Sequence, residues 1–299
     1  MGTLLLEGTF TALVTPFDPE GSAVDYDALD RLVDAQIDGG VSGLVPCGTT
    51  GEAPTLTEVE QVEVIRRVVA RAKGRVPVLA GTGSFSTKKA IAASRAAVEV
   101  GADGVMIVMP YYSKPSQDGM FQYATEVARA VDAPVVLYNV PGRTVADLTT
   151  ATFERICDAA KNVVGIKDAS GNVLRCQEMM RKLGGRAAVM CGDDALTFAM
   201  MALGARGVIS VTSNVLPAKT SKVTTLMKAG KLDEARRAQF DLMDVHELMF
   251  VEPSPAPAKA ALASLGMMNA SVRSPIVAAS EGLVARIRAA IDRIGGAGA

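Results

Sequence analysis

The sequence predicts an α/β fold, a (β/α)8 TIM barrel followed by a C-terminal helical appendage. Short apolar runs alternate with longer amphipathic stretches, and eight such runs occur: FTALVTPF, GLVPCG, VPVLAGTG, GVMIVMPYY, PVVLYNVP, VVGIKDAS, AAVMCGDD and GVISVTSN. The runs are apolar almost throughout, which is typical of parallel strands that are covered on both faces. A doubly wound sheet is the weaker alternative, because no G-x-G-x-x-G motif opens the first unit.

The stretches between the runs have the 3.6-residue period of amphipathic helices, as in residues 25–40 and 57–74. Suitable N-cap residues stand before three of them, namely Thr57, Ser116 and Asn172. Helix-ending glycines follow several of the stretches, at Gly39, Gly74, Gly101 and Gly184. The alternation stops after about residue 230, and the rest reads as helices only. We therefore expect a catalytic barrel in residues 1–230 and a helical domain in residues 231–299.

Composition excludes several classes of protein. The 299 residues include 31 Lys and Arg against 32 Asp and Glu, so the charge pattern offers no basic surface for nucleic acid. No apolar run approaches the ~18 residues of a membrane-spanning helix. The first ten residues, MGTLLLEGTF, lack the basic region of a signal peptide. The widely spaced cysteines fit a reduced, cytoplasmic setting, and we expect no membrane or nucleic-acid partner.

The cysteine and histidine content limits the chemistry. The four cysteines are widely spaced without a C-x-x-C motif, which indicates neither a zinc site nor a disulfide framework. His246 is the only histidine, so acid–base work must fall to other side chains. Asp193 and Asp194 are adjacent, but two such residues are poor evidence for a metal and fit helix capping better. We expect no metal site.

The active site of such a barrel lies at the C-terminal ends of its strands. Lys167 ends the apolar run VVGIKDAS. It could extend to the barrel rim or pair with Asp168. Alternatively it is a nucleophile, because burial disfavours the charged form of an amine, and a neutral lysine can attack a ketone to form a Schiff base. Tyr111, Tyr112 and Tyr138 also follow strand runs, either as proton shuttles or as packing aromatics.

Two further strand ends carry groups that could bind carboxylates. The loop GTTGE, residues 48–52, could direct successive N–H groups at an anion, or it could be a turn whose threonine caps the next helix. Arg143 follows YNVPG and could bind a second carboxylate with both guanidinium nitrogens, or be a solvated loop residue.

Taken in order, these motifs resemble one family. GTTGEAPTL, AGTG, PYYSKPSQDG, YNVPGRT, VGIKDASGN, CGDD, GVISVTSN and FVEPSPAPAK are similar to the pyruvate-dependent class I aldolases, which include dihydrodipicolinate synthases and N-acetylneuraminate lyases. The resemblance extends from about Gly8 to the C-terminal helices. It implies that Lys167 forms the imine with pyruvate, that Tyr138 shuttles protons, and that Thr49 links Tyr138 to a second tyrosine. Tyr112 matches that second tyrosine, which in the family reaches into a neighbouring subunit.

The resemblance also implies how substrates are held. Thr50 matches the residue whose backbone N–H and hydroxyl bind the pyruvate carboxylate, and Gly192 and Ile209 match backbone positions that line the pocket. Arg143 matches the residue that holds the carboxylate of aspartate semialdehyde in the dihydrodipicolinate synthases. N-acetylneuraminate lyases and sugar-acid aldolases usually lack this arginine.

We therefore expect condensation of pyruvate with L-aspartate-4-semialdehyde to 4-hydroxy-tetrahydrodipicolinate, the first committed step of diaminopimelate and lysine biosynthesis. No metal or organic cofactor is expected, because the lysine itself supplies the electron sink. The alternatives are a retro-aldol lyase of a 2-keto-3-deoxy sugar acid or of 4-hydroxy-2-oxoglutarate, a non-catalytic barrel that binds a keto acid, and a metal-dependent aldolase.

The resemblance implies a homo-oligomer, usually a tetramer built as a dimer of dimers. Many members of the family are inhibited by lysine at a subunit interface. Sensitive members carry histidines, an asparagine and a glutamate at positions that match Glu58, Gln61, Phe85 and Lys89 here. Because Lys89 would repel the ammonium of the effector, we expect weak or absent feedback.

Overall fold

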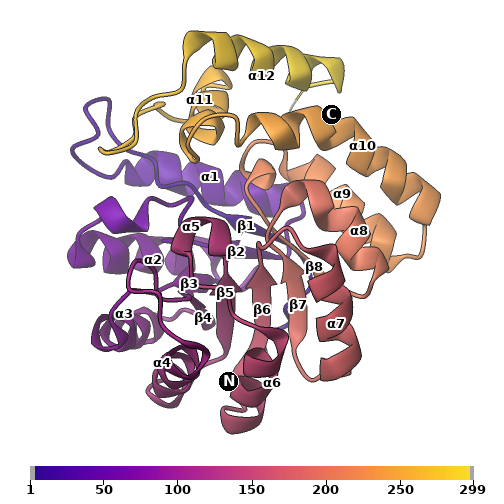
Figure 1. Ribbon diagram of the computed structural model, residues 1–299. Helices are drawn as coiled ribbons and strands as arrows, with labels where there is room; N and C mark the ends of the chain where they lie inside the picture. Colours follow the sequence, from indigo (N-terminus) through magenta and orange to yellow (C-terminus); the bar gives the residue numbers. More distant parts are fainter. Residues whose placement is uncertain (1–3, 297–299) are drawn as a thin grey trace.

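Eight parallel strands form one closed sheet at the centre of the computed structural model, which describes residues 4–296 (Figure 1). The strands are β1 (Gly8–Ala12), β2 (Gly43–Val45), β3 (Leu79–Gly81), β4 (Gly104–Val108), β5 (Val135–Asn139), β6 (Val163–Asp168), β7 (Ala188–Cys191) and β8 (Gly207–Ser210). Their order is β2-β1-β8-β7-β6-β5-β4-β3, and a parallel bridge between Leu44 and Val78 closes the ring. The predicted (β/α)8 TIM barrel is confirmed.

Helices surround the barrel: α1 (Tyr26–Asp38), α2 (Glu58–Ala72), α3 (Thr87–Glu99), α4 (Gln117–Arg129), α5 (Pro141–Thr144), α6 (Thr150–Ala159), α7 (Val173–Leu183), α8 (Thr197–Ala202) and α9 (Pro217–Lys228). The predicted N-caps are confirmed, since Thr57, Ser116 and Asn172 each accept a backbone N–H three residues on. Two helix ends differ: Lys73 caps α2 in the left-handed conformation and Val100 caps α3, so Gly74 and Gly101 each follow one residue later. Among the described residues, no helix is both long and apolar enough to span a bilayer.

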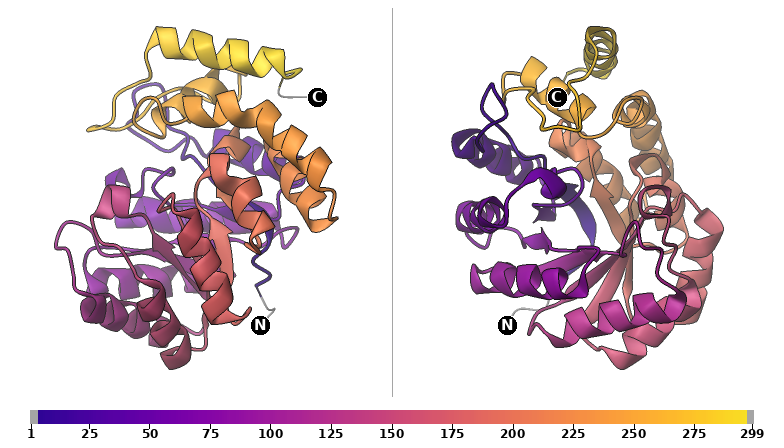
Figure 2. Two further views of the ribbon diagram at one scale, coloured as in Figure 1. Left: turned by 45° about the vertical axis from the view of Figure 1, so that its right-hand side comes forward. Right: turned by 60° about the vertical axis from the view of Figure 1, so that its left-hand side comes forward.

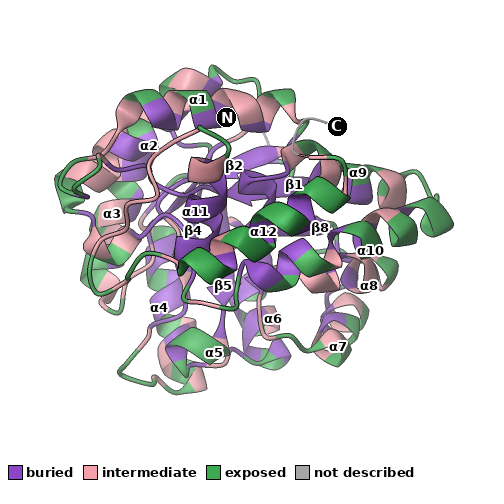
Figure 3. Cartoon of the chain, turned by 90° about the horizontal axis from the view of Figure 1, so that it is seen from above, coloured by how far each residue is buried: buried purple, intermediate pink, exposed green. Residues whose placement is uncertain are grey.

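Three more helices complete the chain: α10 (Leu232–Leu248), α11 (Ala256–Ser264) and α12 (Glu281–Arg293). They lie at the end of the barrel opposite to the N-terminus (Figures 1 and 2). Seen from above, α11 is buried beneath α12, whose outer face is exposed (Figure 3). A boundary between a barrel of residues 1–230 and a helical domain of residues 231–299 stays a prediction.

The apolar core has two layers. One fills the space between sheet and helices, and the other fills the barrel interior with side chains such as Phe10, Met106, Met190 and Ile209. The expected first run, residues 10–17, needs correction, because β1 spans Gly8–Ala12. Beyond the strand, the Val14 N–H donates to the Asn214 side chain (3.0 Å), so this segment already belongs to a loop.

Candidate active site

Lys167 lies near the C-terminal end of β6 and is only 4% exposed. It stands directly opposite Tyr138 on β5, and its Nζ is 4.4 Å from the centre of the tyrosine ring. The side chain therefore does not extend to the solvent at the barrel rim. It does not pair with Asp168 either, whose carboxylate accepts hydrogen bonds from Ser170 and Asn139. Within residues 4–296, no carboxylate lies within ion-pair distance of the Lys167 amine.

A partly buried polar network links the ends of β5 and β6. The Asn139 amide donates to Asp147 (3.0 Å) and to Asp168 (3.4 Å), and the carboxylate of Asp147 binds Arg175 through both oxygens. Burial raises the pKa of Asp168, while hydrogen bonds from Ser170 and Asn139 oppose the shift. This network was not predicted from the sequence, although Asn139 and Asp168 each directly follow a predicted reactive residue. The network fixes the strand ends that carry Tyr138 and Lys167.

The GTTGE loop between β2 and α2 is a compact turn. The N–H of Gly51 donates to the Gly48 carbonyl, and the N–H of Glu52 donates to the Thr49 carbonyl, both at 3.1 Å. Thr50 is buried. The alternative in which a threonine of this loop caps the next helix is wrong, because Thr57 caps α2.

Cys47 precedes this loop and is buried with a positive φ of 55°. Burial raises the pKa of its thiol to about 12, so the group stays protonated at neutral pH. Its Sγ lies 3.7 Å from the Gln61 carbonyl. We conclude that Cys47 packs beside the loop as an unreactive thiol.

A cavity of about 660 Å³ opens at this end of the barrel. Thr49, Tyr138 and Arg143 line it, so the structure brings together three predicted residues from three strand ends. Arg143 lies on α5, is exposed, and has no acidic partner among the described residues. No direct hydrogen bond joins the hydroxyls of Thr49 and Tyr138 in the described chain. The two residues line the same cavity but share no hydrogen bond.

Gly192 and Ile209 flank the lysine from the other side. The Gly192 N–H donates to the Asp168 carbonyl at 2.8 Å, which places this glycine next to the end of β6. A Cβ at Gly192 would lie 2.6 Å from the Ala169 Cβ, so only glycine fits here. Ile209 belongs to the same interior cluster as Tyr138.

Lys167, Thr50 and Ile209 are buried and Gly192 is half-buried close to the cavity, without being among its lining residues, whereas Tyr112 lies in solvent. Its side chain is 94% exposed, its φ is 71°, and it does not line the cavity of its own chain. A large aromatic side chain that is held in a strained conformation and left in solvent is unusual for an isolated subunit. The arrangement agrees with a role outside the subunit that carries it.

The adjacent Asp193 and Asp194, which follow β7, accept hydrogen bonds from backbone N–H groups. Asp194 accepts the N–H groups of Val211 (2.8 Å) and Thr212 (3.2 Å), and Asp193 accepts the N–H of Ala195 (3.1 Å). The expected capping role is confirmed. His246 bonds Thr212 at 2.8 Å, and burial lowers its pKa, which favours the neutral imidazole.

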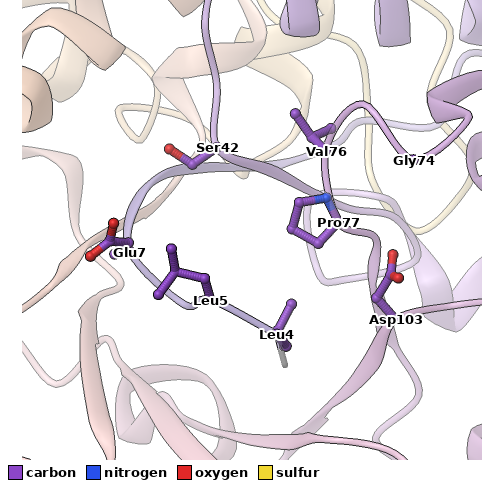
Figure 4. A pocket seen from close by; sticks show the side chains of 8 residues that line it. All are labelled: Leu4, Leu5, Glu7, Ser42, Gly74, Val76, Pro77 and Asp103. Atoms are coloured by element: carbon purple, nitrogen blue, oxygen red, sulfur yellow. The ribbon is translucent and has the colours of Figure 1, made fainter. Parts of the chain in front are cut away.

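A second, smaller hollow of about 360 Å³ lies at the N-terminal end of the barrel. Leu5, Glu7 and Asp103 are among its lining residues (Figure 4). This end of a TIM barrel generally carries stability and not catalysis. The cavity beside Lys167 is therefore the candidate active site.

Comparisons with known proteins agree with this geometry. The sequence model of the Dihydrodipicolinate synthetase family matches residues 5–294. The chain belongs to this family. A 4-hydroxy-tetrahydrodipicolinate synthase of Sorangium cellulosum is 68% identical over 98% of both chains. The predicted resemblance to the dihydrodipicolinate synthases is confirmed.

Solved structures of dihydrodipicolinate synthases also match. The crystal structure from Aquifex aeolicus has a TM-score of 0.95 and 39% identity, and covers 98% of this chain and 99% of its own. A chloride-inhibited dihydrodipicolinate synthase from Acinetobacter baumannii, solved in complex with pyruvate, has a TM-score of 0.95 and 38% identity. The match covers 97% of this chain and 99% of that chain.

Proposed function

We propose that this protein condenses pyruvate with L-aspartate-4-semialdehyde to 4-hydroxy-tetrahydrodipicolinate, through a Schiff base on Lys167. The observation that carries the proposal is the position of Lys167, which is buried in the barrel, has no carboxylate partner in the described chain, and faces Tyr138. Membership of the dihydrodipicolinate synthetase family and a 68% identical relative named 4-hydroxy-tetrahydrodipicolinate synthase support it. The reaction would be the first committed step of diaminopimelate and lysine biosynthesis.

The chemistry follows from these groups. The amine of Lys167 attacks the ketone carbon of pyruvate, and water leaves to give an imine. The methyl group then loses a proton to give an enamine, with the hydroxyl of Tyr138 moving protons. The enamine carbon attacks the aldehyde of the second substrate. The amino group of that substrate closes onto the imine carbon, and Lys167 leaves as the free amine.

The carboxylates of the two substrates bind at different residues. Thr50, in the compact GTTGE turn, holds the pyruvate carboxylate, and Gly192 and Ile209 line the pocket beside it. Arg143 lines the cavity and binds the carboxylate of the semialdehyde, because a guanidinium group can donate two parallel N–H bonds to one carboxylate. A neutral polyol acceptor would not need this guanidinium, so we favour the synthase over the retro-aldol lyase.

The active unit in this proposal is a homo-oligomer. Thr49 and Tyr138 complete their proton path with Tyr112 of a second copy, which the exposure of Tyr112 supports. A dimer suffices for this contact, and a tetramer built as a dimer of dimers is the expected assembly. We also place the enzyme in the cytoplasm, because its four cysteines are free thiols.

Reduction of the imine tests the proposal. The protein is incubated with pyruvate, reduced with borohydride, and examined by intact mass and peptide mapping. We expect one pyruvate adduct per chain on Lys167, and none in Lys167→Ala. Consumption of aspartate semialdehyde, set against a panel of sugar-acid aldehydes, then identifies the acceptor. A folded wild-type protein that gives no adduct would contradict the proposal.

A further inference from the structure

Two oppositely charged side chains are completely buried at the end of the barrel that carries the candidate active site. Glu52 ends the GTTGE loop and Lys259 lies on α11, and both side chains are 0% exposed. The Lys259 Nζ donates to Glu52 Oε1 at 2.7 Å. Lys259 is the one charged residue of helix α11. Charged groups are almost never fully buried unless they are paired, so each residue needs the other.

The position of Glu52 ties this ion pair to the carboxylate-binding loop. Its backbone adopts the left-handed conformation with φ 54°, and its N–H donates to the carbonyl of Thr49 at 3.1 Å. The second carboxylate oxygen accepts the backbone N–H of Arg273 at 2.9 Å. The loop is therefore held by its own turn on one side and by the segment after the barrel on the other.

Phe17 completes the surroundings of the ion pair. The Lys259 Nζ lies 4.0 Å from the centre of its ring, and the Arg273 guanidinium lies 4.3 Å from it. Burial lowers the pKa of Lys259 to about 8, and the attraction of Glu52 opposes this shift. Desolvation of two charges generally cancels most of the gain from pairing, so a buried ion pair adds little net stability. A role in fixing one geometry explains its presence better.

We propose that Glu52 and Lys259 are positioning residues through which the C-terminal helices set the geometry of the Thr49–Thr50 turn, and with it the affinity for the pyruvate carboxylate. Neither residue touches the substrate. The inference rests on the proposed function, because it assumes that this turn binds pyruvate. It adds that the helical appendage acts on the active site and does more than cover the barrel.

The test replaces both charges with neutral groups of similar shape. In Glu52→Gln with Lys259→Met, no unpaired charge is left buried, and the glutamine carbonyl can still accept the Arg273 N–H. We expect the half-saturating pyruvate concentration for borohydride trapping on Lys167 to rise about tenfold, because small displacements of binding groups have large effects. Trapping at saturating pyruvate should equal that of the wild type.

The matched control removes a lysine–glutamate pair from the opposite end of the barrel. Lys228 and Glu7 pair at 2.6 Å, and Glu7 lies at the N-terminal hollow (Figure 4). Lys228→Met with Glu7→Gln should leave the half-saturating concentration unchanged. If the double variant of the buried pair does not fold, Glu52→Asp is measured, since it keeps both charges and shortens the side chain that joins the turn to Lys259 by one methylene group.

The outcomes separate the two proposals. Wild-type protein without an adduct contradicts the proposed function, whatever the variants do. A wild-type adduct, together with half-saturation within twofold of wild type in the folded variant, would overturn the positioning role. A lower melting temperature with unchanged half-saturation would overturn it as well, because the pair would then be structural only.

Discussion

Lys167 stands opposite Tyr138 because the pairing of β5 with β6 shifts by one residue. Val135 pairs with Val163, but Val136 pairs with Gly165, and the register continues from there to Tyr138 and Lys167. Without the shift, Ile166 would lie opposite Tyr138. A one-residue slip turns every following side chain to the other face of a sheet. The irregularity therefore decides that the amine enters the barrel interior.

Gly165 allows this shift and gives the first prediction. A Cβ at this position would lie 2.7 Å from the Ala188 carbonyl oxygen and 2.7 Å from Leu6 Cδ2. We expect Gly165→Ala to lower the unfolding free energy by about 1–3 kcal/mol and kcat by at least about tenfold, because β6 must move. Gly282→Ala on α12, where a Cβ meets nothing within 4 Å, is the control. Unchanged kcat in Gly165→Ala would refute the prediction.

The sequence predicted the barrel well because strand period, helix caps and apolar runs are local signals. It also predicted that Lys167, Tyr138, Thr49 and Arg143 lie at the same end of the barrel, since the carboxyl ends of parallel strands meet at one face. The register shift between β5 and β6 could not be predicted, because neither PVVLYNVP nor VVGIKDAS shows where the pairing of the two strands changes. The contact of Glu52 with Lys259 was also missed, since it joins residues 207 positions apart.

Tyr138 should govern proton transfer and not imine formation. In Tyr138→Phe the ring remains beside Lys167, and only the hydroxyl is lost. We expect kcat to fall by about 10²–10³, within the range for removal of a general acid–base group. Pyruvate should still be trapped on Lys167 after long incubation. Steady-state rates and borohydride trapping check both parts, and a kcat within threefold of wild type would count against this role.

Sharing of Tyr112 between subunits predicts complementation. Tyr112→Phe and Lys167→Ala are each expected to have little activity. When the two variants are mixed, unfolded together and refolded, one site of a hybrid dimer has both residues intact. We expect activity to return toward about a quarter of wild type, as random pairing of two subunits allows. No recovery, in a mixture shown by native mass spectrometry to contain hybrids, would argue against the shared site.

Feedback by lysine should be weak or absent. Glu58, Gln61, Phe85 and Lys89 all line the same cavity. The Lys89 ammonium lies 5.9 Å from the centre of the Phe85 ring and would repel an incoming ammonium, while Phe85 offers no hydrogen bond to a carboxylate. Steady-state rates with and without millimolar L-lysine check this, and strong inhibition would show the prediction to be wrong.

Glu60 should contribute stability that is lost in acid. Arg273 binds its carboxylate through two hydrogen bonds (2.7 and 2.9 Å) and holds the pKa of Glu60 at about 2, against an ordinary value of 4.5. Because the folded state has the lower pKa, the unfolded state takes up the proton first. The contribution is therefore fully present above pH 4.5 and is lost as the pH falls toward 2.

Glu60→Gln isolates this contribution from that of other carboxylates. The pKa difference corresponds to about 3 kcal/mol. Urea unfolding at several pH values should show the variant less stable than wild type at neutral pH, with the gap closing between pH 4.5 and 2. Glu234→Gln, which removes an exposed carboxylate 3.6 Å from Lys231, should leave the pH profile of stability unchanged. A gap that stays constant with pH would mean that Glu60 stabilises through packing and capping of α2, and not through its charge.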